Sequence, residues 1–236
     1  MNLLRIFTPT IAALCMLGSA HALTVHHTIS LQSNEIALQM SDWELETLLL
    51  PQFNSSQGTL DSVTITLMGK LAGSAAAENT GRGAAQVTLN LTATLVLVDP
   101  LSGATLVHTT PSISNSFAAS AYDGVTDYGG TSGRSYAHLA SQSSATSLTF
   151  TDGATLARFT GGGTVGTQLL AFGESYTSSA ANIRADFTTN AGGYASVTYH
   201  YHTTRLQVTA VPEPETWALM LVGLALVSFL AKRRQP

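Results

Sequence analysis

The chain has 236 residues, of which 44% are hydrophobic and only 10% charged, and its formal net charge is −4. Of its 10 Lys and Arg residues, the six that lie in 23–210 are scattered, which excludes the basic surface that nucleic-acid binding requires. The single cysteine, Cys15, lies in the first segment, so the rest of the chain has no disulfide, thiolate metal site or cysteine nucleophile.

Residues 1–22 are typical of a secretory signal peptide. Arg5 supplies a positive charge, an apolar stretch follows over 11–17, and Ala20 and Ala22 form an A-x-A cleavage site. An uncleaved membrane anchor is the competing interpretation, but the apolar stretch is shorter than the about 20 residues that a spanning helix needs. We therefore predict export and cleavage after Ala22.

Strands with one buried face dominate residues 23–210, the expected single domain. In 86–98, apolar residues alternate with polar ones, and 62–67 and 194–209 repeat this period of two. A short helix is predicted over 41–49, with Ser41 or Asp42 as its N-cap. Weaker strands are predicted over 23–32, 104–109, 147–151, 157–160, 168–172 and 183–188. The predicted fold is mainly β, a jelly-roll-like antiparallel β-sandwich of about eight to ten strands.

Residues 122–144 have no clear periodicity and form either a long surface loop or two short strands. The segment contains Asp123 and Asp127 in the sequence YDGVTDYGG. Carboxylates in such a loop are candidate calcium ligands, although Ca²⁺ takes about 6 to 8 oxygens and the EF-hand pattern is absent. Asp and Gly also simply form turns. Both interpretations stay open.

His200 and His202 alternate with Tyr199 and Tyr201, so both imidazoles face one side of a strand. Such a pair could bind zinc if a third ligand came from elsewhere in the chain. A polar strand face with cross-strand neighbours explains the same spacing. We therefore assign no metal and no cofactor. The candidate third ligands are His26, His27, His108 and His138.

Catalytic motifs are absent: the sequence contains neither G-x-S-x-G nor H-E-x-x-H, and we expect no enzyme activity. Rows of threonine, Thr64 with Thr66 and Thr88 with Thr92 and Thr94, could form a hydroxyl face that contacts glycan or ice. Ordinary strand propensity explains the same rows. Trp43 and the tyrosines are candidate platforms for stacking sugar rings.

The end of the chain joins an apolar segment to a basic cluster. Residues 216–231 correspond to about 24 Å of helix at about 1.5 Å per residue. A hydrocarbon core is about 30 Å thick, so a transmembrane helix over 216–231 is short but sufficient if the bilayer thins locally. Lys232, Arg233 and Arg234 follow, and the positive-inside rule places them in the cytoplasm with the body facing outward.

Residues 211–236 resemble the PEP-CTERM protein-sorting signal, because Val211, Pro212, Glu213 and Pro214 precede the apolar helix and the basic cluster. The resemblance implies export by a Gram-negative bacterium that makes extracellular polysaccharide. It also implies handling of the tail by exosortase, a multi-pass membrane enzyme similar to a cysteine transpeptidase. Pro212, Glu213 and Pro214 would then be recognition residues. An ordinary tail anchor is the alternative.

The body resembles the choice-of-anchor E domain, a β-rich exported module that occurs with different C-terminal anchors. The resemblance rests on 50–80, on RFTGGGTV at 158–165 and on VTYHYHT at 197–203, with Asn54 where the family usually has Asp. Its matching residues in the first stretch are Phe53, Gly58, Thr59, Leu60, Val63, Glu78 and Asn79. It implies fold and location and assigns no chemistry.

The sequence therefore predicts an exported, non-enzymatic surface or biofilm-matrix protein. It would be anchored in the inner membrane through 211–236 before processing, and afterwards found at the cell surface or outside the cell. Its expected partners are an exosortase-type enzyme, the membrane and possible extracellular polysaccharide. The alternative is a secreted carbohydrate-binding or carbohydrate-active protein with the same tail.

Overall fold

The structure, a computed structural model, describes residues 20–208 and 214–233 and divides into two units. We call His26–Thr203 the body; the other unit comprises Met1–Val25 and Thr204–Pro236. The elements are β1 (Ala20–Met40), β2 (Trp43–Pro51), the 3₁₀ helix η1 (Ser55–Gln57), β3 (Thr59–Asn79), β4 (Ala85–Val98), β5 (Thr105–Thr109), β6 (Ser112–Ala119), β7 (Gly133–Phe150), α1 (Gly153–Arg158), β8 (Thr164–Gly173), β9 (Tyr176–Ser178), β10 (Ile183–Val208) and α2 (Pro214–Arg233).

Two sheets form the body. One has four strands in the order β1-β10-β3-β7, and the other has six, with β2-β8-β4-β5 as its path and β6 and β9 also paired to β4. The pairings of β3 with β7 and β10, and of β4 with β5, β6, β8 and β9, are antiparallel. This arrangement is consistent with the predicted antiparallel β-sandwich.

The core lies between the sheets because their inward residues are apolar. β4 contributes six buried side chains, those of Val87, Leu89, Leu91, Ala93, Leu95 and Leu97, and confirms the period of two expected there. Val63, Ile65 and Leu67 of β3 and Val197 of β10 belong to the same core from the facing sheet. Alternation in the sequence therefore predicted the buried face of β4 and of parts of β3 and β10.

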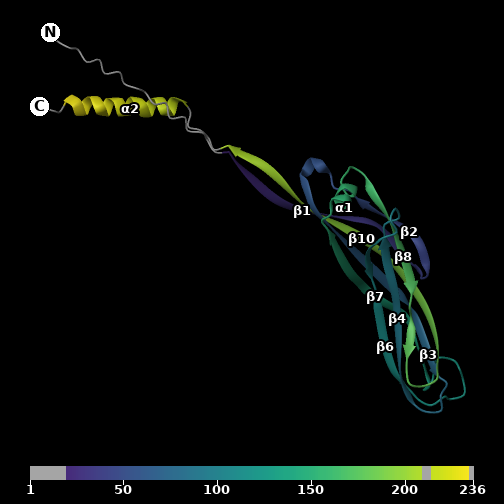
Figure 1. The fold of residues 1–236 in the computed structure, drawn as a ribbon. Coiled ribbons are helices and arrows are strands. Elements are labelled where there is room, and N and C mark those ends of the chain that lie inside the picture. Colours follow the sequence, from purple (N-terminus) through teal and green to yellow (C-terminus); the bar gives the residue numbers. More distant parts are fainter. Residues whose placement is uncertain (1–19, 209–213, 234–236) are drawn as a thin grey trace, which may run out of the picture. The chain divides into compact units, whose positions relative to one another are not determined.

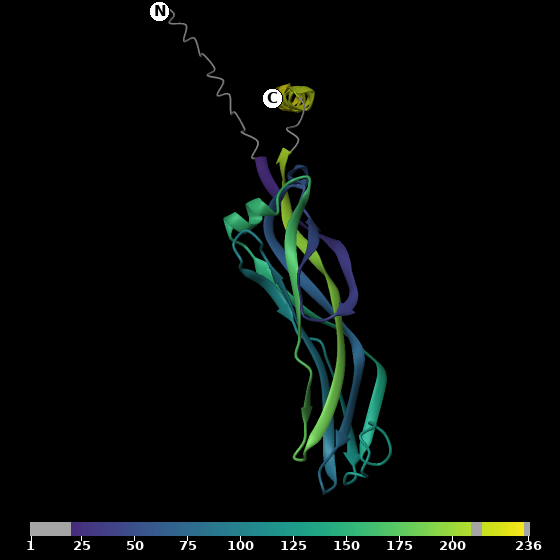
Figure 2. The same ribbon diagram turned by 90° about the vertical axis from the view of Figure 1, so that its right-hand side faces the viewer.

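The long strands β3 and β10 run along the body, with α1 near one end (Figures 1 and 2). At the other end three connections meet, 80–84, 120–132 and 179–182, and we call this the loop end. The backbone N–H of Tyr122 donates to Gly81 O at 2.9 Å, and that of Thr80 donates to Asn182 O at 2.9 Å. These bonds hold the three connections together.

Two local predictions were wrong. The expected helix over 41–49 is mostly strand β2, which pairs with β8 and buries Leu48 and Leu50. Asp42 and Leu45 have φ of 68° and 69°, which a right-handed helix does not allow. The expected strand over 157–160 is instead the end of α1, whose N-terminus Asp152 caps by accepting from Thr155 N at 2.9 Å.

The segment 122–144 is a loop followed by part of one long strand, and the two short strands of the second alternative are not observed. Residues up to Ser132 form an irregular loop, and the remainder belongs to β7, which begins at Gly133. The other weaker strands occur within β1, β5, β7, β8 and β10. The first part of β7 has no periodicity that would predict a strand. It is a strand because it pairs with β3, in a register that runs from Val63 opposite Phe150 to Glu78 opposite Gly133.

The predicted helix at the end of the chain is present as α2. Within the described residues, no helix is both long and apolar enough to cross a bilayer.

Candidate functional site

The sorting tail is the first candidate site. Val211, Pro212 and Glu213 lie outside the described residues, as does Arg234, whereas Pro214 is the first residue of α2. Lys232 and Arg233 occupy its last turn, where cations interact favourably with the carbonyl end of a helix. Two residues of the basic cluster, Lys232 and Arg233, therefore form the C-terminal end of α2.

The apolar side chains of α2 are exposed within its own unit. Leu219 is 74% exposed and Val227 is 67% exposed. Ser228, the polar residue within the apolar stretch, donates its hydroxyl to Leu224 O at 2.7 Å, so the helix satisfies this group internally. A helix with apolar residues on all sides needs apolar surroundings.

The predicted signal peptide lies almost entirely outside the described residues, which begin at residue 20. Ala20 and Ala22, the predicted cleavage residues, fall at the start of β1. The signal peptide and its cleavage position therefore stay predictions.

The two histidines of the H-x-H motif have different partners. His202 Nδ1 lies 2.6 Å from Asp61 Oδ1, and His26 Nδ1 lies 3.5 Å from Asp61 Oδ2. Asp61 stands at a register shift between β3 and β10, and its carboxylate lies between the two imidazoles, whose ring centroids are 5.9 Å apart. His200 Nδ1 instead contacts Thr28 Oγ1 at 3.1 Å. The two candidate zinc ligands thus belong to different polar contacts, with His202 in a carboxylate–imidazole cluster and His200 bonded to a threonine.

The other candidate zinc ligands do not complete a metal site with His200 and His202. His27 bonds to Thr203 Oγ1 at 3.1 Å and stacks on Tyr201, while His108 and His138 are exposed on β5 and β7. In the part of the chain that the structure describes, no three His, Cys, Asp or Glu side chains form a group that could hold a metal. The cross-strand polar face is therefore the interpretation that the structure favours.

Asp123 and Asp127 lie in the loop 120–132 and organise its turns. Asp123 Oδ1 accepts from Val125 N at 3.0 Å, and Asp127 Oδ1 accepts from Gly129 N at 2.8 Å. The turn-forming role is thus observed, and each carboxylate keeps Oδ2 outside these bonds. The sequence prediction of turns at Asp and Gly is correct here.

Two polar side chains beside this loop are buried, which was not predicted from the sequence. Glu78 and Asn79 at the end of β3 are both 0% exposed. Asn79 is fully bonded: its Nδ2 donates to Gly83 O and Ser120 O at 2.8 and 2.7 Å, and its Oδ1 accepts from Gly81 N at 2.9 Å. Glu78 Oε1 and Oε2 have no hydrogen-bond partner. The sequence signal that could have indicated a buried acid is the position of Glu78 directly after the alanine-rich run 75–77.

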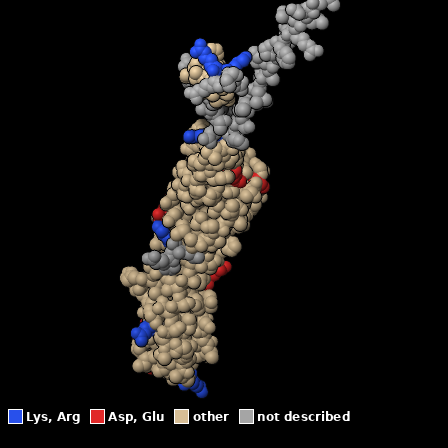
Figure 3. Space-filling model, turned by 90° about the vertical axis from the view of Figure 1, so that its left-hand side faces the viewer, with Lys and Arg blue, Asp and Glu red and all other residues tan. Residues whose placement is uncertain are grey.

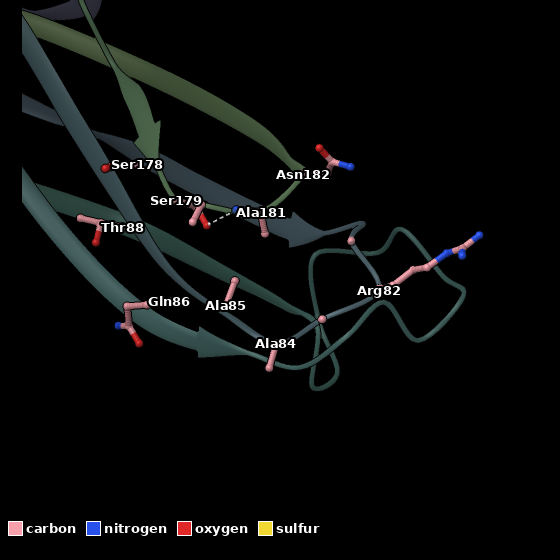
Figure 4. A pocket seen from close by; sticks show the side chains of 12 residues that line it. Arg82, Ala84, Ala85, Gln86, Thr88, Ser178, Ser179, Ala181 and Asn182 are labelled. Carbon is pink, nitrogen blue, oxygen red and sulfur yellow. Dashed lines mark hydrogen bonds between the residues drawn. The ribbon is translucent and has the colours of Figure 1, made fainter.

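A groove of about 850 Å³ opens at the loop end, lined by 81–86, Thr88 and 178–182 (Figure 4). Its lining is small and polar, and Ser179 Oγ accepts from Ala181 N at 3.2 Å. Arg82, the one charged residue of this lining, points its side chain away from the other labelled residues in Figure 4. The groove therefore presents no nucleophile with a base beside it.

The expected threonine rows exist, and their hydroxyls bond to neighbouring strands. Thr64 contacts Thr149, Thr66 contacts Ser147 and Thr88 contacts Ser116, each at 2.8 Å. Thr92 and Thr94 donate to Glu174, to its backbone oxygen and its carboxylate respectively. Charged side chains are few on the face of the body in Figure 3.

Trp43 does not form the expected stacking platform. It packs against the core, and its indole N–H is buried without a hydrogen-bond partner. Among the tyrosines, Tyr199 is fully buried, whereas Tyr176 and Tyr122 are exposed.

Comparison with known proteins identifies the tail. Residues 210–234 match the PEP-CTERM protein-sorting motif. The motif implies an exported protein that is membrane-associated before processing by exosortase. No curated protein matches the chain.

Solved structures share only a distant likeness with the chain. A chain from infectious bursal disease virus, Gx strain, is 11% identical with a TM-score of 0.19, and covers 92% of this chain and 51% of its own length. The corresponding Gt-strain chain is 13% identical with a TM-score of 0.15, covering 92% and 52%. The VP2 subviral particle of the same virus gives 13% and 0.17, with the same coverage. This chain thus spans about half the length of those chains, and TM-scores this low support no inference.

Proposed function

We propose that this chain is a non-enzymatic surface or extracellular-matrix protein of a Gram-negative bacterium, exported and then processed at its C-terminal signal. In this proposal, 1–22 is the cleaved signal peptide, 23–210 is the functional domain and 211–236 is the sorting signal. The observation that carries the proposal is the PEP-CTERM match at 210–234.

The chemistry of the tail supports recognition by a membrane enzyme. Pro212 and Pro214 fix φ and favour an extended chain before the helix. A stiff extended segment loses little conformational entropy when a protease-like groove binds it. The apolar surface of α2 keeps this segment at the membrane, and Lys232, Arg233 and Arg234 orient it.

The polar groups of the body support a non-enzymatic role. Catalysis by a nucleophile needs a base within hydrogen-bond reach and a pocket around the pair. The imidazoles of His26 and His202 contact Asp61, and those of His27 and His200 contact threonine hydroxyls that do not line the groove at the loop end. The groove itself has no titratable group except Arg82. These arrangements stabilise strands.

Packing at one end of the core supports the resemblance to the choice-of-anchor E domain. The three stretches behind that resemblance contribute Phe53, Phe159, Tyr199 and Tyr201, whose rings meet there. The ring of Phe53 lies 5.6 Å from that of Tyr199 and 4.9 Å from that of Tyr201, and Phe159 lies 6.5 Å from Tyr199. The three stretches of the resemblance are far apart in the sequence, and their aromatic residues pack together in one cluster.

A second candidate function is weak binding of extracellular polysaccharide. The hydroxyl-rich strand faces and the small polar lining of the groove favour it, since neutral sugars are bound mainly through hydrogen bonds and ring stacking. Co-sedimentation with the polysaccharide of the native host tests it. Recovery of the body in the supernatant at every polysaccharide concentration would contradict it.

Intact-mass analysis of protein from the cell envelope and the culture medium tests the main proposal. We expect a mass that lacks 1–22 and the tail beyond the Pro-Glu-Pro region. The variant Glu213→Gln should accumulate the unprocessed form in the membrane, whereas the matched control Glu215→Gln should be processed normally. A chain that keeps its tail to Pro236 and occurs only in the membrane would show a plain anchor.

A further inference from the structure

The loop end contains a buried acid that no protein group neutralises. Glu78 is 0% exposed, and neither carboxylate oxygen has a hydrogen-bond partner. Arg184 is its cross-strand neighbour in β10, yet the ion pairs of the described residues do not include Glu78. Burying an ionised carboxylate without a partner is costly, so this position needs a compensating positive charge or a proton.

The loop 120–132 covers this carboxylate, and glycine makes room for it. Glu78 lies opposite Gly133 in the β3–β7 register. A Cβ on Gly133 would stand 2.2 Å from Glu78 Oε2, 2.6 Å from Gly129 N and 2.7 Å from Tyr128 C. The carboxylate therefore points into the turn formed by 128–130.

Two further carboxylates approach the same turn from the loop. Asp123 Oδ2 lies 2.8 Å from the position of a Cβ on Gly130, and Asp127 Oδ1 accepts from Gly129 N. Tyr128 and Gly130 have φ of 57° and 60°, and such left-handed residues turn backbone carbonyls in a new direction. The turn beside the buried acid is thus also approached by the carboxylates of Asp123 and Asp127.

We propose that Glu78 is the buried ligand of a divalent-cation site beneath the loop 120–132, and that the site takes Ca²⁺. Calcium accepts oxygen ligands from carboxylates, backbone carbonyls and water in flexible geometry. Because no group of three acidic or imidazole side chains forms in the described residues, the carbonyls of the loop and water supply most of the shell. This inference is independent of the sorting function of the tail.

Calcium titration of the full chain in detergent, after treatment with EDTA, tests the proposal. Calorimetry should show one ion bound with a dissociation constant on the order of 10⁻⁴ to 10⁻³ M, the range of extracellular modules. Hydrogen exchange of the peptide that covers 120–134 should slow about tenfold when calcium saturates the site. Tb³⁺ should give luminescence sensitised by Tyr128.

Two variants make the test specific. Glu78→Gln keeps the shape of the side chain and should lose calcium binding and the slowed exchange, whereas Glu44→Gln, an exposed acid on β2, should keep both. Asp123→Asn should weaken binding about tenfold and provides the test if Glu78→Gln does not fold. Unchanged exchange and no saturable heat up to about 10 mM Ca²⁺ in the unsubstituted chain would overturn the proposal.

Discussion

Single residues join the two sheets, and Tyr199 does so with one buried hydroxyl. Its side chain is fully buried on β10, and its hydroxyl donates to Pro51 O of β2 at 2.6 Å. Burial raises the pKa of this hydroxyl, so it stays neutral across the physiological range. The bond crosses from the four-stranded sheet to the six-stranded sheet.

Replacing Tyr199 by Phe should therefore destabilise the body by about 1 to 2 kcal/mol, because the Pro51 carbonyl loses its donor while the ring contacts persist. Urea unfolding measures the change. The control is Tyr176→Phe on β9, an exposed position where we expect less than about 0.5 kcal/mol. Equal stabilities of the two variants would contradict the role of the hydroxyl.

Asp99 gives the body a second residue-scale feature, a dependence on acid. Its carboxylate pairs with Arg158 of α1 and accepts from Leu101 N at 2.9 Å and Ser102 Oγ at 2.8 Å. The hydrogen bond from Arg158 is the main reason that the pKa of Asp99 falls from 3.8 to about 2. Since the folded pKa is lowered, the stabilisation is complete above pH 3.8 and disappears as the pH falls through about 2.

Asp99→Asn should therefore cost about 1 to 2 kcal/mol at neutral pH and nothing at about pH 2. Unfolding free energies of both proteins between these limits measure the difference. Asp186→Asn, at an exposed position on β10, serves as the control with the same chemical change. A difference from the parent chain that does not vary with pH would rule out the ion pair as its source.

Whole elements were predictable where their period matched their burial. In β4, every second residue over 87–97 is buried, and all six of these buried residues are apolar. β2 was mistaken for a helix because Glu44 and Glu46 after Asp42 suit a first helical turn, while its pairing with β8 lies far away in the sequence. α1 was missed because its cap, Asp152, follows strand residues without a break.

The candidate sites, too, were predictable only where they depend on local sequence. The tail is a local motif, so its residues were found from the sequence alone. The cluster of His26, Asp61 and His202 depends on the register of β3 with β10, and the burial of Glu78 depends on a loop that begins after β6. Neither arrangement has a local signature.

The pairing of β3 and β7 at the loop end depends on Gly133. A Cβ at this position would meet Glu78 Oε2 and two backbone atoms at less than 3 Å. Gly133→Ala should therefore destabilise the body by more than about 2 kcal/mol, because backbone must move. Gly166→Ala on β8, where nothing lies within 4 Å, is the matched control in thermal unfolding. Equal melting temperatures would show that the end of the sheet rearranges freely.

At the scale of the whole molecule, the sorting motif and the folded body occupy separate parts of the chain. Residues 210–234 carry the sorting motif, and the body has its own hydrophobic core within His26–Thr203. Changes in the tail should therefore alter location without altering the fold.

The combined variant Lys232→Gln, Arg233→Gln and Arg234→Gln tests this separation. It should reduce correct membrane orientation and processing, because the positive-inside signal is removed. Protease accessibility in membrane vesicles measures orientation, and thermal unfolding of the body serves as the control. Wild-type orientation and processing in the variant would refute the assignment of these residues.

The placement of the two chain ends has a mechanical consequence for a tethered protein. The body begins on β1 and ends on β10, and these neighbouring strands meet where His27 Nε2 bonds to Thr203 Oγ1 at 3.1 Å. Tension between the two termini would open the β1–β10 ladder one bond at a time. Tension between Thr203 and a partner held at the loop end would instead load the β3–β10 ladder along its strands, perpendicular to its hydrogen bonds. A body tethered through β10 therefore resists a force along its strands, which shears the β3–β10 ladder. It resists less a force between its two termini, which opens the β1–β10 ladder one bond at a time.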